Sequence, residues 1–159
     1  MALEYHWEDY EIGQSFQTGG RTLTDADIRL FLGATDATHP AHVDREYCKH
    51  HPFGRPTIPG ALTLGAVDGL VVRYLVSQKI NIAHYGYDKI RFLKPVYPGD
   101  TLTLIATVAT KKEKNNEFGI ISFNYEVKNQ DNELVAVMTD LQMIEKKNKN
   151  DPMEAHNEQ

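Results

Sequence analysis

This sequence has almost no cysteine, no long apolar run and no excess of positive charge. The single cysteine, Cys48, excludes an internal disulfide and any zinc or iron–sulfur site that needs several cysteines. No apolar stretch approaches the roughly 20 residues of a membrane-spanning helix, so a membrane is not an expected partner. Because 17 Lys and Arg stand against 22 Asp and Glu, for a net charge of −5, a nucleic acid is not expected either, since a phosphate backbone favours a basic face.

The chain has the size and composition of one globular domain. It has 159 residues, of which 41% are hydrophobic and 25% charged, both ordinary values for a soluble protein. The acidic and aromatic start, MALEYHWEDYE, resembles neither a signal peptide nor a basic transit segment, so we expect a cytoplasmic protein. We predict a single domain over residues 1–145 and a polar, disordered tail over 146–159. The lysine runs at 111–114 and 146–147 are interpreted as solvated charges of loops or tails.

Helical signals dominate the first half of the chain. Thr24-Asp25-Ala26-Asp27 has the pattern of a capping box, which predicts a helix that ends before Pro40. A short strand is expected before it, over 15–23, and a second short helix after it, from Asp44. Residues 50–60 contain three prolines and two glycines, which favours a rigid loop. The nearly continuous apolar stretch that follows, Ala61–Val76, predicts a helix buried on most sides.

From residue 82 the hydrophobic period changes to two. Apolar and polar residues alternate in four segments separated by polar turn formers, at 85–92, 101–108, 121–127 and 134–144. An antiparallel sheet with this pattern must bury one face, and the apolar helix is available to cover it. We therefore predict an α+β fold in which an antiparallel sheet wraps around one long central helix, the layout of the hotdog architecture.

The segment at 35–44 concentrates groups that can transfer protons. It carries the carboxylates of Asp36 and Asp44 and the imidazoles of His39 and His42 within nine positions. An imidazole titrates near neutral pH and can take or give a proton during turnover, while a carboxylate beside it can fix its tautomer or hold a water. This combination suits the activation of one water molecule.

Two other interpretations of this segment stay open. In the first, Asp36 caps a turn and His42 makes a hydrogen bond in the core. In the second, His39 and His42 bind a metal together with Asp44, because zinc sites use His and Asp. Pro40 stands between the two histidines and breaks the helix that would align them, which counts against the metal.

A second candidate feature lies at the start of the apolar helix. Free backbone N–H groups cluster at a helix N-terminus and favour negative charge. Because Gly60 has no side chain, a ligand oxygen can approach its N–H closely, which would provide an oxyanion site for a thioester carbonyl. Alternatively, Gly60 only eases a tight entry from loop to helix. Asp68, in the middle of the helix, is expected to be structural, and Cys48 a small buried apolar residue.

Five segments, in the right order, resemble the MaoC-like dehydratases, whose best-known members are (R)-specific enoyl-CoA hydratases. The segments are Glu8–Gly13, Arg21–Ile28, His39–Asp44, Phe53–Pro56 with Pro59-Gly60, and Arg91–Asp100. The resemblance implies a hotdog fold, a homodimer or higher homo-oligomer, and a site at the dimer interface. It also implies an acyl-CoA thioester substrate, with no metal and no cofactor apart from the CoA of the substrate.

The resemblance also implies roles for particular residues. In this family an Asp, and a His five positions later, hold the water that adds across the enoyl double bond, and a Gly N–H binds the thioester oxygen. His42 matches the histidine and Gly60 the glycine, but Ala37 occupies the aspartate position and Asp36 precedes it. Either Asp36 acts through an altered turn, His39 takes over part of the work, or hydration is lost. Pro59 stands where many members carry a histidine.

We therefore expect the reversible hydration of a 2-enoyl-CoA, catalysed by Asp36, His42 and Gly60, with His39 and Pro59 binding the substrate. Two alternatives remain. A hotdog thioesterase would release free thiol, and Asp68 would be the residue to test in it. A non-catalytic acyl-CoA-binding protein would show saturable binding without turnover.

Overall fold

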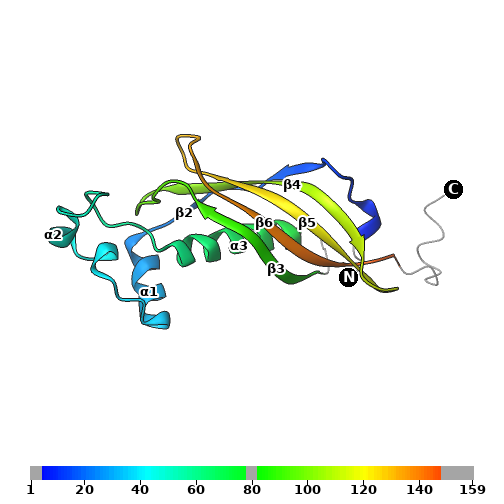
Figure 1. Cartoon of the computed structure of the whole chain (residues 1–159), viewed down its shortest axis with the longest axis horizontal. Coiled ribbons are helices and arrows are strands. Elements are labelled where there is room, and N and C mark those ends of the chain that lie inside the picture. The colour runs from blue at the N-terminus through cyan, green and yellow to red at the C-terminus, as the bar shows by residue number, and fades with distance from the viewer. Residues whose placement is uncertain (1–4, 78–81, 148–159) are drawn as a thin grey trace.

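A computed structural model describes residues 5–77 and 82–147. An antiparallel sheet curves around the long helix α3, and a helical lobe extends beyond one end of that helix (Figure 1). In chain order the elements are η1 (Trp7–Asp9), β1 (Ser15–Gln17), β2 (Arg21–Thr22), α1 (Asp25–Thr35), η2 (Pro40–His42), α2 (Arg45–Cys48), α3 (Gly60–Ser77), β3 (Ile82–Phe92), β4 (Thr101–Glu113), β5 (Phe118–Lys128) and β6 (Leu134–Glu145). The strand order is β1-β4-β5-β6-β3, with β2 paired to β4. This arrangement confirms the predicted hotdog fold.

Helix α3 is the core of the molecule. Its 18 residues are long and apolar enough to cross a membrane by length and composition alone. One side of the helix packs into the hydrophobic core, with six residues buried: Thr63, Ala66, Val67, Leu70, Val71 and Leu75. Opposite them, β4 and β5 alternate between buried and less buried positions, as the period of two predicted.

One end of the sheet buries charge, which the sequence analysis did not anticipate. Asp140 in β6 is fully buried and accepts hydrogen bonds from Tyr125 (2.6 Å) and Gln142 (2.5 Å). Its other carboxylate oxygen lies 2.9 Å from Nε2 of His84 in β3. Burial raises the pKa of Asp140, because a low-dielectric site disfavours the carboxylate. Close by, the hydroxyl of Tyr87 donates to Asp68 of α3 at 3.4 Å. These contacts tie β3 to its neighbours and give Asp68 a structural partner.

The start of α1 follows from the capping box. Thr24 accepts a hydrogen bond from the N–H of Asp27 (3.3 Å), and Asp27 accepts one from the N–H of Thr24 (2.8 Å). The predicted boundary is confirmed at this end, and at the other end the helix stops at Thr35, before Pro40. The start of α1 is therefore set by local sequence.

The lysine run at 111–114 is not a loop, contrary to the sequence interpretation. The first three residues of that run end strand β4. Lys111 donates to the carbonyl oxygens of Glu8 and Tyr10, and its ammonium group lies 4.6 Å from the centroid of the Trp7 ring. The aliphatic part of the Lys111 side chain can pack on apolar surface while its ammonium group stays among polar groups. A lysine is therefore tolerated at this partly exposed end of β4.

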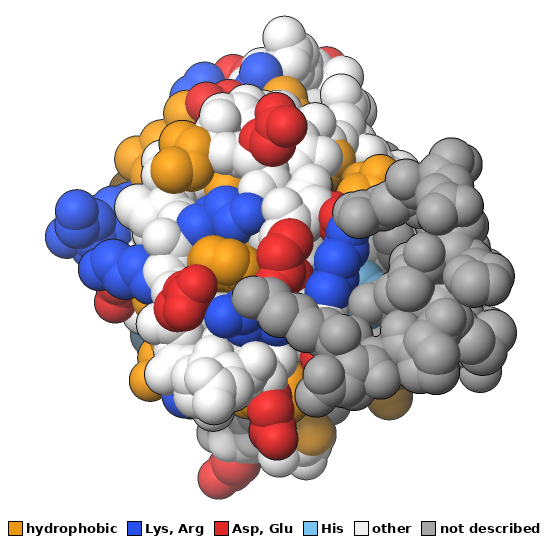
Figure 2. Space-filling model, turned by 90° about the vertical axis from the view of Figure 1, so that its right-hand side faces the viewer, with side chains coloured by type: hydrophobic (Ala, Val, Ile, Leu, Met, Phe, Trp, Pro, Cys, Tyr) orange, Lys and Arg blue, Asp and Glu red, His pale blue; other side chains and the backbone are white. Residues whose placement is uncertain are grey.

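The predicted tail begins with two ordered contacts. The N–H of Lys146 donates to the carbonyl of Glu117 (2.8 Å), and Nζ of Lys147 lies 2.7 Å from the carboxylate of Asp9. The rest of that tail, 148–159, lies outside the described residues. Acidic and basic side chains are interspersed on this end of the molecule, opposite the helical lobe (Figure 2).

Candidate active site

Asp36 lies where α1 ends. It adopts the left-handed conformation (φ 55°, ψ 21°), and its N–H donates to the carbonyl of Leu32 at 2.9 Å. Asp and Asn tolerate this conformation better than most residues. The chain then turns sharply, with the N–H of Thr38 donating to the carbonyl of Asp36 and that of His39 to the carbonyl of Ala37, both at 2.9 Å. The helix therefore ends at Thr35 with Asp36 as its C-cap, and Ala37 lies in the turn that follows.

The two histidines of the segment have opposite tautomers. Nδ1 of His39 accepts a hydrogen bond from the N–H of Ala41 (3.2 Å), so in the neutral ring the proton sits on Nε2. Nδ1 of His42 lies 2.8 Å from the carbonyl oxygen of Thr57, which can only accept, so Nδ1 carries the proton and Nε2 is unprotonated. The neutral pair thus offers one donor, Nε2–H of His39, and one base, Nε2 of His42. The ring centroids are 6.2 Å apart.

A pair of hydrogen bonds fixes His42 relative to the start of α3. The ring of His42 donates to the carbonyl of Thr57, and the N–H of Thr57 donates to the carbonyl of Ala41 at 3.2 Å. Ala41, Thr57 and the intervening Cys48 are buried, and the thiol of Cys48 donates to the carbonyl of Ala41 at 3.5 Å. Cys48 is therefore the small buried residue that the sequence predicted. The imidazole of His42 is therefore hydrogen-bonded to the backbone of Thr57, which precedes Gly60 by three residues.

Gly60 begins α3, and its N–H is one of the first helical donors, which have no partner within the helix. The glycines with positive φ are Gly13, Gly54 and Gly99, and Gly60 is not among them. An added Cβ at Gly60 would lie 2.9 Å from Cε2 of Phe92. The absence of a side chain therefore admits the ring of Phe92 and does not serve an unusual backbone turn. The buried Pro59 accepts hydrogen bonds at its carbonyl from the N–H (2.9 Å) and the hydroxyl (3.3 Å) of Thr63.

His42 also faces a hollow of about 300 Å³ in the helical lobe. The rest of its lining is contributed by α1, the link between η2 and α2, the start of α2 and the loop before α3: Asp25, Ile28, Arg29, Val43, Arg45 and Pro56. Asp36, His39, Pro59 and Gly60 do not line it. The predicted site residues therefore lie on connected segments of the chain. Of these residues, His42 is the one that lines the hollow.

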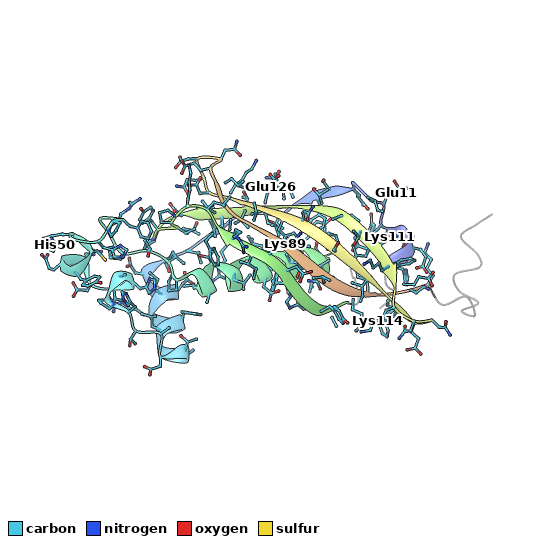
Figure 3. All side chains as sticks on the ribbon, in the orientation of Figure 1. Glu11, His50, Lys89, Lys111, Lys114 and Glu126 are labelled. Carbon is cyan, nitrogen blue, oxygen red and sulfur yellow. The ribbon has the colours of Figure 1, made fainter. Side chains whose placement is uncertain are left out.

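Other candidate groups lie apart from this region. Among residues 5–77 and 82–147, no group of three or more His, Cys, Asp or Glu side chains is placed to hold a metal ion. His50 lies at the outer end of the lobe and Lys111 at the opposite end of the molecule (Figure 3). Asp68 follows Gly60 by eight residues, about 12 Å along the helix axis at 1.5 Å per residue, and it is engaged by Tyr87.

Sequence reasoning missed two of the residues beside His42. The sequence analysis did not single out Arg29 or Arg45, which lie on α1 and α2 and which only the tertiary fold brings to one hollow. The available signal was weak: both are basic residues on short helices on either side of the segment at 35–44.

The comparisons with known proteins show which domain family the chain resembles. A model of the MaoC like domain matches residues 9–133. The (R)-specific enoyl-CoA hydratase of Rhodospirillum rubrum is 32% identical over 104 residues, which are 65% of this chain and 69% of that protein. Protein MaoC of Klebsiella aerogenes is 34% identical over 110 residues, which are 69% of this chain but only 32% of that protein. The chain thus spans about a third of the latter's length.

A solved structure has the same fold. The crystal structure of a monoamine oxidase regulatory protein from Archaeoglobus superimposes with a TM-score of 0.85 and 31% sequence identity, and covers 92% of this chain and 98% of the other. The likeness includes the helical lobe as well as the sheet and α3, because nearly the whole chain is covered.

Proposed function

Because the chain belongs to the MaoC-like domain family, we propose that it is a hydro-lyase that reversibly hydrates a 2-enoyl-CoA to a 3-hydroxyacyl-CoA. The observation that carries the proposal is the fixed pair of tautomers at His39 and His42, one a donor and one a base. The substrate class is supported by relatives such as the (R)-specific enoyl-CoA hydratase of Rhodospirillum rubrum.

In the proposed reaction, water adds to the β-carbon while the α-carbon gains a proton. Nε2 of His42 and the carboxylate of Asp36 between them take one proton from the water and return one to the α-carbon, so both groups are unchanged after turnover. The thioester oxygen gains negative charge as the enolate forms, and the N–H of Gly60 at the start of α3 stabilises it. His39, through Nε2–H, and Pro59 position the substrate. The reaction needs no metal and no cofactor beyond the CoA of the substrate.

We also propose a soluble, cytoplasmic homodimer. Strand β3 forms one edge of the sheet, and large apolar side chains of β3, its following residue and α3 are exposed: Val72 (46%), Val76 (68%), Tyr85 (54%), Phe92 (50%) and Leu93 (52%). An exposed edge and apolar residues of this kind favour association with a second copy. Light scattering in solution tests this point, and a monomer at all concentrations would contradict it.

The decisive variant is His42→Ala. Loss of a general base lowers kcat by about 10²- to 10⁴-fold, so we expect enoyl absorbance of crotonyl-CoA to persist with this variant. The matched control is His50→Ala, which removes an exposed imidazole from the outer end of the same lobe and should leave the rate unchanged. Free thiol is measured in the same reactions, because its release would indicate a thioesterase. Full hydration by the folded His42→Ala protein would remove His42 from the mechanism.

A further inference from the structure

The hollow beside His42 has a chemical character that hydration alone does not require. Three of its lining residues are apolar: the buried Ile28, the half-buried Pro56 and the exposed Val43. Its other lining residues include two guanidinium groups, Arg29 from α1 and Arg45 from α2. A neutral acyl chain would be accommodated by the apolar part and would gain nothing from the arginines.

The two arginines are available to a ligand. Arg21 pairs with Asp27 at 2.9 Å, and Arg55 lies 3.6 Å from the centroid of the Tyr97 ring. The side chains of Arg29 and Arg45 are exposed, and neither has a hydrogen bond, ion pair or ring contact within residues 5–77 and 82–147.

The charge of the hollow is positive. Asp25 is the only carboxylate in its lining, against two guanidinium groups. A planar guanidinium group matches the geometry of carboxylate and phosphate oxygens. An anionic group is therefore the ligand that this lining recognises.

We propose that this hollow binds an anionic group of the thioester substrate through Arg29 and Arg45, next to the imidazole that performs the chemistry. The inference rests on the proposed function for the identity of the thioester. Two parts of such a substrate carry anionic oxygens: a carboxylate at the far end of the acyl chain, and the phosphates of CoA.

The position of the hollow favours the acyl carboxylate. Its lining includes His42, the proposed base at the β-carbon, whereas in an acyl-CoA the long pantetheine arm separates the thioester from the phosphates. The substrate class is then a dicarboxylic enoyl-CoA.

The test measures binding of saturated thioesters, which cannot be hydrated, so its outcome is independent of whether the protein is a hydratase. Succinyl-CoA and butyryl-CoA differ only by a carboxylate in place of a methyl group, and butyryl-pantetheine lacks the phosphates of CoA. Each is titrated by calorimetry against the wild type, the double variant Arg29→Gln/Arg45→Gln and the control Arg73→Gln. Arg73 is an exposed arginine of α3 outside the hollow, and circular dichroism checks that every variant is folded.

We expect succinyl-CoA to bind the wild type about tenfold more tightly than butyryl-CoA, which is the scale of two partly exposed charge pairs. The preference should vanish in the double variant and persist in Arg73→Gln. If the double variant instead weakens both CoA thioesters equally and leaves butyryl-pantetheine unaffected, the anion is a CoA phosphate and the anionic subsite stands. Equal affinities of wild type and double variant for all three compounds would overturn the proposal.

Discussion

Gly60→Ala separates the structural role of this glycine from its proposed role in the reaction. The new methyl group would lie 2.9, 3.2 and 3.3 Å from three atoms of the Phe92 ring. That ring is 50% exposed and can rotate away, and alanine also restricts the unfolded chain, which stabilises by about 0.4–1 kcal/mol where the backbone is compatible. We therefore expect the free energy of unfolding to change by less than about 1 kcal/mol.

The catalytic effect of the same substitution should be much larger. A methyl group and a displaced ring crowd the N–H at the start of α3, where the thioester oxygen is proposed to bind. Loss of one oxyanion donor costs about 10²- to 10³-fold in kcat, or roughly 2.7–4 kcal/mol of transition-state stabilisation. The measurement combines urea denaturation with hydration kinetics on crotonyl-CoA.

The matched control is Gly65→Ala in the same helix, where an added Cβ meets no atom within 4 Å. It should be as stable as the wild type or slightly more so, with unchanged kcat, since alanine favours a helix over glycine by about 1 kcal/mol. Unchanged kcat in folded Gly60→Ala would refute the oxyanion role. A loss of several kcal/mol of stability would show instead that the glycine serves the packing of Phe92.

Two further predictions concern stability. Thr24→Ala removes the side chain of the capping box and should lower the free energy of unfolding, measured by urea denaturation, by about 1 kcal/mol. Hydrogen bonding from Thr24 is the main cause that lowers the pKa of Asp27, so NMR titration should show a higher pKa of Asp27 in the variant. An unmoved pKa would contradict this account. Asp140→Asn tests the buried carboxylate: its pKa is raised by burial in the folded state, so the folded protein binds the proton more tightly and wild-type stability should fall as pH rises from about 3.8 through the raised pKa. Denaturation across that range should show a smaller decline in the variant, and equal slopes would exclude Asp140 as its source.

Local periodicity was enough to predict the main elements of the fold. The capping box located the start of α1, and the change of hydrophobic period at residue 82 located the sheet. The buried charge of Asp140 was not predictable in this way. Its partners come from β3, β5 and β6 itself, and a period of two says which positions face inward without saying how a polar residue there is satisfied.

The candidate site was only partly accessible from the sequence for a similar reason. The spacing of His39 and His42 indicated proton chemistry, but their tautomers depend on which backbone groups the rings meet, a neighbouring N–H for one and the distant carbonyl of Thr57 for the other. The roles of Asp36, His39, His42, Pro59 and Gly60 remain predictions.

The contacts between η2 and Thr57 also bear on how such a protein can diversify. Residues 43–56 leave and return at two points that are joined by the hydrogen bonds of Ala41 and His42 with Thr57, and this excursion supplies Val43, Arg45 and Pro56 to the hollow. Loops tolerate changes of sequence and length better than the elements they connect. Mutations in residues 43–56 can change which substrate group the hollow binds while the imidazole of His42 keeps its position relative to α3. Substrate selectivity can therefore evolve separately from the chemistry.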